Sequence, residues 1–134
     1  MGFSAYLADK LAGQYNGTAY TWPTTVYLAL FQVQPTNGTG GTEANYTGYA
    51  RVELAMTSTN FTVSGNNVKN AAQISFPTNT GTTGQTEVGY GIFDAATGGN
   101  LLHDNLANTS QTINPNSPAY VPAGDLSITF TIAP

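Results

Sequence analysis

The chain has 134 residues, and charged residues make up 7% of it, against about 25% in an ordinary globular domain. Three basic residues are too few for the clustered cations that a duplex-binding surface needs, so nucleic acid is excluded as a partner. The absence of cysteine excludes disulfides, thiol nucleophiles and thiolate metal sites. No apolar run approaches the roughly 18 residues of a membrane span, so we expect a soluble protein that is made in the cytosol and binds no membrane.

A short helix is predicted near the start of the chain, over about residues 4–12. Ser4 suits the N-cap position, and Gly13 suits a left-handed residue at the helix end. Leu7 and Leu11 lie four residues apart and form an apolar stripe. A helix of under three turns is marginal alone in water. We therefore expect this stripe to be buried against the rest of the domain or against a partner.

The remainder of the chain is predicted to form strands. Residues 24–33, "TTVYLALFQV", are nearly continuously apolar, which is typical of a central strand covered on both faces. Residues 34–48 have no periodicity and many turn residues, so we expect an exposed loop there. Residues 49–57 alternate regularly. Their core-facing set is Ala50, Val52, Leu54 and Met56.

Three more stretches complete the strand pattern. "FTVSGNNVKNAAQISF", residues 61–76, predicts a hairpin that turns at "SGNN", followed by a strand that ends before Pro77. In "TEVGYGIFD", residues 86–94, two glycines leave one strand face bare, which permits close approach of another layer. The last strand alternates clearly. Its inward-facing set is Leu126, Ile128, Phe130 and Ile132.

These elements predict an all-β fold. About seven or eight short strands, separated by turns and not alternating with helices, indicate an antiparallel β-sandwich of jelly-roll or immunoglobulin-like kind. One short N-terminal helix accompanies them. The length fits a single domain over residues 1–134, because a chain of this size buries roughly 68% of the surface of its unfolded form. The order of the strands cannot be obtained from the sequence.

The segment "YGIFDAATGGNLLHDNL", residues 90–106, places Asp94, His103 and Asp104 close together in the sequence. Such residues can perform acid–base chemistry when the fold brings them into hydrogen-bond reach. A β-hairpin explains them equally well, since the Gly pair allows positive φ and Asp94 can accept hydrogen bonds from turn amides. His103 and Asp104 would then lie at the polar far end of the return strand. We expect the hairpin, and no enzymatic activity.

Other carboxylates give no stronger catalytic or metal site. Glu43 is expected in a loop, and Glu53 and Glu87 at solvent-facing strand positions. The sequence has neither an Asp-x-Asp-x-Asp-Gly pattern nor paired histidines at metal-ligand spacing. We therefore expect no metal and no cofactor, and a small glycan hydrolase built on paired carboxylates is the least favoured function.

Several segments, in this order, resemble a family of small virion proteins of tailed bacteriophages. They are "FSAYLADKLAG", "YTWPTTVYLALFQVQPTNGTGGTE", "GYARVEL", "ISFPT", "VGYGIFDAATGGNLLHDNL" and "VPAGDLSITF". Members of this family are often labelled phage tail fibre proteins, and some look like capsid decoration, or cement, proteins. The resemblance covers nearly the whole chain and implies a virion component. The absence of coiled-coil heptads and of β-helix repeats predicts a compact knob rather than a fibre shaft.

The leading hypothesis is a capsid decoration protein on the outer capsid surface, synthesised in the host cytoplasm. It would bind the major capsid protein and associate with itself, as a trimer or dimer, by burying neutral surface. Such a contact, or the edge of the core, would use Phe3, Tyr6, Leu7 and Leu11.

The alternative is a tail-fibre or tail-associated adhesin that binds host surface glycans. Tyr20, Trp22 and Tyr27 lie close together in the sequence, and aromatic rings can stack on sugar rings. The Gly-rich loop at residues 35–48 is a second candidate for glycan contact. Partly buried aromatics at the edge of a core explain the same three residues and are the more common arrangement.

Overall fold

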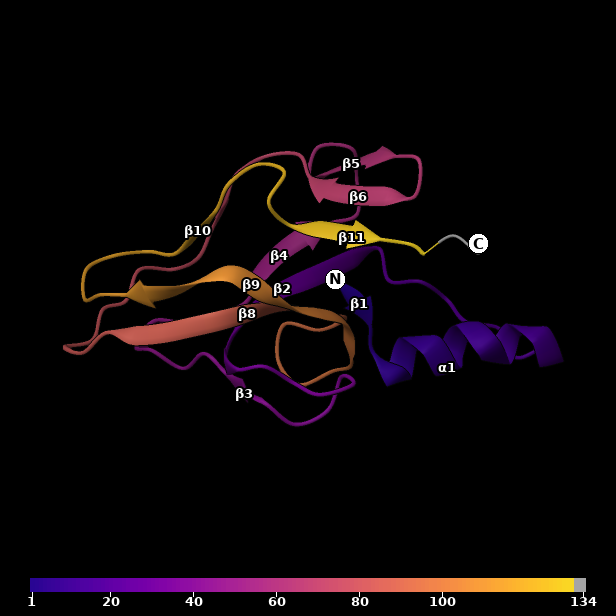
Figure 1. Cartoon of the computed structure of the whole chain (residues 1–134), viewed down its shortest axis with the longest axis horizontal. Coiled ribbons are helices and arrows are strands. Elements are labelled where there is room, and N and C mark those ends of the chain that lie inside the picture. The colour runs from indigo at the N-terminus through magenta and orange to yellow at the C-terminus, as the bar shows by residue number, and fades with distance from the viewer. Residues whose placement is uncertain (132–134) are drawn as a thin grey trace.

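The computed structural model describes residues 1–131, and within them it shows eleven strands, one α-helix and one 3₁₀ turn (Figure 1). Every strand pair is antiparallel, and the strands fall into sheets of six, three and two. The fold is an all-β sandwich, as the sequence predicts. It has more strands than the seven or eight expected, because several are only two residues long.

The six-stranded sheet has the order β1-β9-β8-β2-β3, and β4 also pairs with β2. Its strands are β1 (Gly2–Phe3), β2 (Thr25–Val33), β3 (Thr42–Glu43), β4 (Val52–Ala55), β8 (Gln85–Phe93) and β9 (Leu101–Ile113). β4 pairs with the first half of β2 and β3 with the second half, along the edge that β8 does not use. β2 is therefore the central strand that its apolar sequence predicts.

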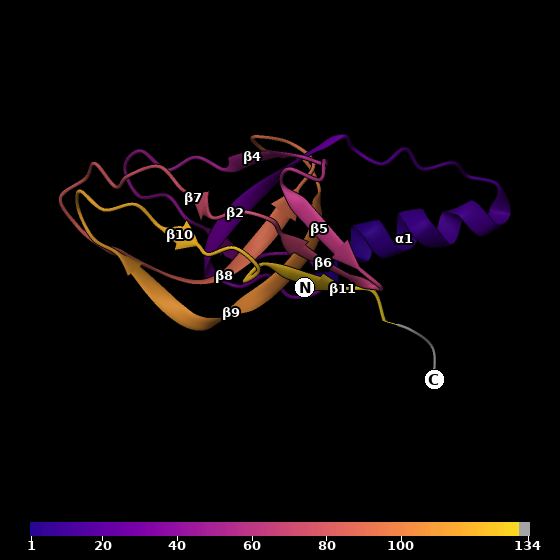
Figure 2. The same ribbon diagram turned by 90° about the horizontal axis from the view of Figure 1, so that it is seen from above.

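Two smaller sheets complete the sandwich (Figure 2). One consists of β5 (Phe61–Ser64), β6 (Asn67–Asn70) and β11 (Ser127–Thr129), and the other of β7 (Ile74–Ser75) and β10 (Tyr120–Val121). β5 and β6 form the predicted hairpin, and Gly65 in its turn has a φ of 58°. Apolar side chains from the large sheet and from both smaller sheets join in one core cluster.

β2 is buried on both of its faces, as predicted. Leu28 and Leu30 belong to the main core, whereas Phe31 packs with Leu101 in a second cluster on the opposite face. Gly91 of β8 makes the second cluster possible, because a Cβ atom there would lie 2.5 Å from the Phe31 ring. The space at Gly91 is thus filled by side chains of the two neighbouring strands of the same sheet, and not by the separate layer that was expected.

The predicted helix is α1 (Ala5–Gly13), and the Ser4 hydroxyl caps it by accepting a hydrogen bond from the Leu7 N–H at 3.1 Å. Gly13, expected in a left-handed conformation, is right-handed with a φ of −58°. The chain instead continues into the 3₁₀ turn η1 (Gln14–Asn16), and Gly17 takes the left-handed position with a φ of 87°. The turn supplies partners for the last carbonyls, so the helix needs no left-handed residue at Gly13. No helix within residues 1–131 is long and apolar enough to cross a membrane.

Residues 34–48 are not the wholly exposed loop that was expected. They contain β3, and both Ala44 and Tyr46 are buried. The Gln85 side chain of β8 holds this segment, since its Oε1 accepts hydrogen bonds from the backbone N–H groups of Asn45 and Tyr46 at 2.9 and 3.1 Å. A side-chain amide distant in the sequence thus replaces a strand partner here.

The inward alternation of the last strand holds only in part. Leu126 and Ile128 are buried, but Phe130 is 37% exposed, and Ile132 lies outside the described residues. Met56, also expected to face the core, is 46% exposed. Phe130 and Met56 each lie just beyond the end of a strand, where the opposing sheet no longer covers them.

Arg51 connects three segments of the large sheet. Its Nε and Nη2 donate hydrogen bonds to the two Glu43 carboxylate oxygens, each at 2.8 Å. Its Nη1 donates to the carbonyls of Ala95 and Gly98 at 2.7 and 2.8 Å. The guanidinium also lies 3.5 Å from the centre of the Phe93 ring. Glu43 is therefore an ion-paired strand residue and not the loop residue that was expected.

Glu87 is buried, although the sequence predicted a solvent-facing position. It is 3% exposed, and neither carboxylate oxygen has a hydrogen-bond partner among the described residues. The reason is an irregularity between β8 and β9, where Glu87 pairs with Gln111 but Gly89 pairs with Leu106. The surplus residues of β9 help to enclose the carboxyl group. Burial raises the pKa of Glu87 to about 7.

The Arg51 contacts predict a large loss of stability in an Arg51→Leu variant. The Arg51 side chain is 7% exposed, and its removal would leave the Glu43 carboxylate with the Tyr49 hydroxyl as its remaining donor and would take the guanidinium donor away from two loop carbonyls. We expect the free energy of unfolding to fall by about 3 kcal/mol, measured by urea denaturation. Glu53→Gln, an exposed change on the neighbouring strand, is the control. Equal urea denaturation midpoints for Arg51→Leu and Glu53→Gln would contradict the stabilising role assigned to Arg51.

The buried Glu87 carboxyl predicts a specific pH dependence of stability. Its native pKa of about 7 lies above the ordinary value of 4.5, so between these values the native state binds more protons than the unfolded state. The contribution of Glu87 to the free energy of unfolding should therefore decrease as pH rises through this window and level off above it, by about 3 kcal/mol in total. Buried His103, whose pKa is lowered from 6.5 to about 4, contributes in the opposite direction, so the Glu87 component is obtained as the difference between the profiles of wild type and variant. Glu87→Gln should remove this component, whereas Glu53→Gln should retain it. Parallel pH profiles for wild type and Glu87→Gln would refute the prediction.

Candidate functional site

An apolar groove of about 610 Å³ lies between the six-stranded sheet and the β5–β6–β11 sheet. Its floor is the main core, with Val26, Ile92 and Leu102 contributed by the three central strands β2, β8 and β9. Its rim consists of large apolar side chains that are exposed to solvent. These rim residues are Trp22 (39% exposed), Met56 (46%), Val63 (70%) and Phe130 (37%). Exposed apolar side chains around a hollow are typical of an interaction site.

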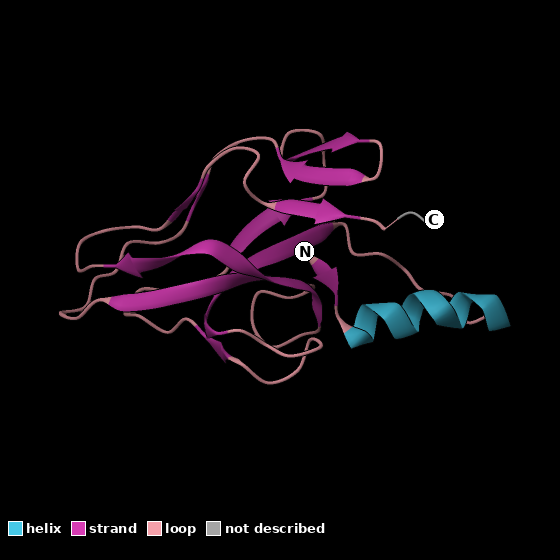
Figure 3. Cartoon of the chain, viewed as in Figure 1, coloured by secondary structure: helices cyan, strands magenta, loops and turns pink. Residues whose placement is uncertain are grey.

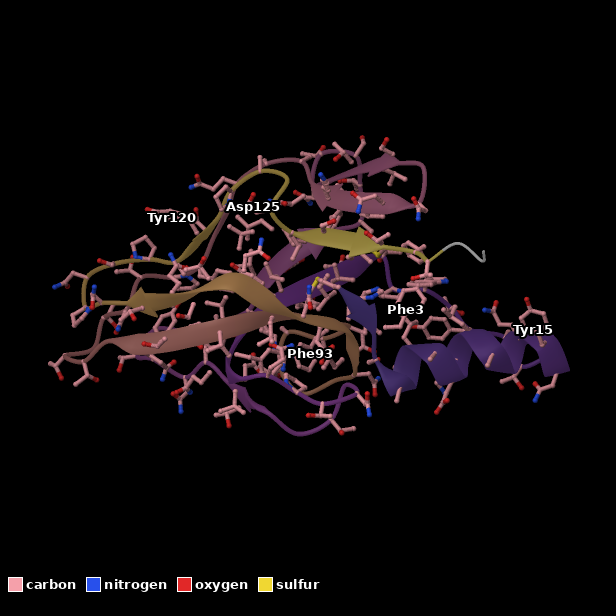
Figure 4. The ribbon with its side chains drawn as sticks, viewed as in Figure 1. Phe3, Tyr15, Phe93, Tyr120 and Asp125 are labelled. Atoms are coloured by element: carbon pink, nitrogen blue, oxygen red, sulfur yellow. The ribbon has the colours of Figure 1, made fainter. Side chains whose placement is uncertain are left out.

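Phe3 lies beside the groove. β1 pairs with β9 so that Phe3 is opposite His103. The Phe3 ring is centred 5.1 Å from the His103 ring and 5.2 Å from the Phe130 ring. Figure 4 shows Phe3 between the sandwich and the first turn of α1. This aromatic contact connects the start of the chain to the segment after β11.

The groove carries no charge near neutral pH. Among the described residues that line it there is no Asp, Glu, Lys or Arg, and His103 is the only titratable one. His103 is 5% exposed, and its Nδ1 has no hydrogen-bond partner among the described residues. Burial lowers the pKa of His103 to about 4, so the imidazole is neutral. The surface therefore suits an uncharged, apolar contact.

Asp94, His103 and Asp104 do not form a catalytic group. Asp94 is part of the hairpin turn, where its carboxylate accepts hydrogen bonds from the Asn100 N–H at 2.7 Å and from the Asn100 side chain at 2.9 Å. His103 and Asp104 are consecutive residues of β9 and so project from opposite faces of the strand. They do not lie at its far end, as was expected, because β9 continues to Ile113.

The hairpin itself is as predicted from the sequence. Gly98 and Gly99 have φ values of 59° and 71°, and the Asp94 N–H donates to the Asn100 carbonyl at 3.1 Å. Within residues 1–131, His, Asp and Glu side chains form no cluster of three or more that could hold a metal ion.

The four residues predicted to contact the core edge or a partner occupy different environments. Leu7 is completely buried in the main core, and Tyr6 and Leu11 are partly buried against it. Phe3 is 39% exposed. The apolar stripe of α1 is thus largely covered by the domain itself, and only Phe3 remains available at the groove.

The three aromatic residues proposed for glycan contact are not brought together. Tyr20 and Trp22 form an edge-to-face pair with ring centres 5.6 Å apart, and Trp22 lines the groove. Tyr27 follows Val26 in β2 and therefore projects from the strand face opposite to the groove.

Of the four rim residues, sequence reasoning singled out only Trp22, as a candidate for glycan contact. Met56 and Phe130 were assigned to the core, and Val63 was noted only as part of a hairpin. One usable signal was present: Val63 and Val68 are opposite each other in the β5–β6 pair. An apolar pair on so short a hairpin indicates either a core contact or an exposed contact surface, and the sequence alone does not distinguish these.

Comparison with known proteins identifies a family for this fold. The family model described as "Podophage GP4 fiber I protein gp80" matches residues 2–129, which include all the described strands and every groove residue except Phe130. No curated protein matches the chain. Because the match covers nearly the whole length, the chain belongs to the podophage GP4 fiber I protein gp80 family and is a bacteriophage virion protein.

Proposed function

We propose that this virion protein is a capsid decoration, or cement, protein. It sits on the outer capsid surface, binds the major capsid protein and associates with other copies of itself. The uncharged groove and its exposed apolar rim carry the proposal, because a hollow with this rim offers contact area to a neighbouring subunit at little desolvation cost. Neutral side chains are cheaper to remove from water than carboxylates or ammonium groups.

The shape of the domain supports a cement role. Residues 1–131 form strands that pack into one sandwich, with a helix that extends to one side (Figure 3). A sandwich with a rim of exposed apolar side chains can fill the space between neighbouring subunits. The low charge of the chain as a whole, 7%, favours close contact with them.

A non-enzymatic role follows from the same observations. The family is described as a fibre protein family, and the one histidine is buried beside Phe3, with no hydrogen-bond partner for its Nδ1 among the described residues. We infer that the chain works through its surfaces and not through catalysis.

The cement role predicts that heads carrying this protein resist heat better than heads without it. Heads assembled with the wild-type chain should release DNA at a higher temperature than bare heads, measured by dye binding during a thermal ramp. Val63→Asp places a charge at the groove rim on a side chain that is 70% exposed, so folding should be retained while the protection is reduced. Equal release temperatures with and without the wild-type protein would exclude the cement role.

A tail-fibre adhesin that binds host surface glycans is the second candidate. The description of the family as a fibre protein and the Tyr20–Trp22 pair, in which Trp22 is 39% exposed, favour it. Under this alternative, Trp22→Ala should abolish binding to host cells, and Tyr27→Phe, on the opposite strand face, should retain it. Density for the protein on tails and none on heads in a particle reconstruction would favour this candidate over the first.

A further inference from the structure

The tip of the N-terminal helical segment presents one aromatic side chain to solvent. Tyr15 in η1 is 98% exposed, the highest exposure among the exposed large apolar side chains of residues 1–131. Figure 4 shows it at the far end of the helical segment, away from the sandwich. Tyrosine is enriched at the centres of protein interfaces because it buries a large ring at low entropic cost.

The turn that carries Tyr15 is held by its own hydrogen bonds. The Asn16 Oδ1 accepts from the Thr18 N–H at 3.3 Å and from the Thr18 hydroxyl at 2.8 Å. The Gly17 and Thr18 N–H groups donate to the carbonyls of Gln14 and Gly13 at 3.2 and 3.1 Å. A presented side chain on a turn fixed in this way loses little conformational entropy when it binds.

The tip and the groove match in chemistry. Residues 13–19, "GQYNGTA", contain no charged side chain, and the described lining of the groove contains none near neutral pH. The groove volume of about 610 Å³ lies within the range of about 300–1,000 Å³ that is usual for pockets that enclose a ligand. An aromatic ring and the neutral residues beside it therefore suit this hollow.

Tyr15 does not occupy the groove of its own chain. Its side chain is almost fully exposed, while the groove rim around Val63 and Met56 is exposed as well. The chain thus carries a free aromatic tip and a free apolar groove at two different places on its surface. The two places do not meet within one chain, so a contact between them requires two molecules.

We propose that the helical tip of one copy, with Tyr15 at its centre, inserts into the groove between the sheets of a second copy. The inference rests on the self-association included in the proposed function. The contact joins two different surfaces, so it is head-to-tail, and repetition of it generates a closed ring or an open filament. A closed ring of three copies agrees with the trimer among the expected oligomers.

The first test measures assembly of single-residue variants by sedimentation. Tyr15→Ala should weaken self-association by about 30-fold or more, as for an interface hot spot, and Val63→Asp should weaken it from the groove side. Tyr120→Ala is the matched control, because Tyr120 is also exposed, at 45%, but lies in β10 outside the groove. Thermal unfolding of each variant verifies that the fold is retained.

The second test uses the absence of cysteine in the chain. Two single variants, Gln14→Cys at the tip and Thr62→Cys at the groove, are mixed and oxidised. A head-to-tail contact predicts that the mixed disulfide dominates over both self-linked products. Gln14→Cys mixed with Thr97→Cys, on the exposed hairpin turn, is the control and should give no such preference.

The outcomes separate this inference from the proposed function. A wild-type chain that remains monomeric at every concentration would overturn the self-association, and this inference with it. Wild-type oligomers that are unaffected by Tyr15→Ala and Val63→Asp, or equal cross-linking in the two mixtures, would overturn the tip-in-groove contact alone. Selective cross-linking together with loss of assembly in both variants supports it.

Discussion

The ion pair of Arg51 with Glu43 is the interaction on which one whole face of the large sheet depends. The guanidinium joins β4 to β3 and supplies donors to two carbonyls of the loop between β8 and β9. It also covers the Phe93 ring, which packs against the second apolar cluster. Arg51 is the only basic side chain among the described residues that is shielded in this way, because Lys10 and Lys69 are exposed. In a chain with so few charges, the Arg51 guanidinium thus contacts loop carbonyls, a carboxylate and an aromatic ring at one place.

The side-chain amides of buried asparagines hold the connecting segments that lie between the strands. Asn79 is fully buried, and its side chain donates to the carbonyls of Thr83 and Ile113 and accepts from the Gly81 N–H. Asn70 serves the segment before β11 in the same manner, with three side-chain hydrogen bonds. Buried polar groups are tolerated when every donor and acceptor has a partner. The abundance of asparagine in this chain therefore has a structural reason, which its composition alone does not reveal.

Much of the fold was predictable where a local pattern decides the structure. The continuous apolar run of β2 predicted a central strand, and Ser4 predicted the helix start. The predictions failed where contacts between residues far apart in the sequence determine the structure. Gln85 holds residues 34–48 as a partly buried segment, and the irregular β8–β9 pairing buries Glu87.

The candidate site was less predictable than the fold, for a related reason. Its rim consists of apolar residues just beyond strand ends or on a short hairpin, and alternation assigns such residues to the core. Whether Met56 and Phe130 are covered depends on where the opposing sheet stops. That boundary is set by strand order, and the sequence contains no local signal for it. The candidate contact residues are apolar residues of the kind found in cores, which the opposing sheet leaves uncovered.

The groove is complete only after the last of its strands has been synthesised. Its lining spans residues 22 to 130, and its wall includes β11, which pairs with β6 across more than fifty residues of intervening chain. During synthesis, a growing chain that has not yet released β11 from the ribosome has no complete groove. The association proposed for this surface therefore requires chains in which β11 has been made, and chains that still lack β11 could not join one another through it.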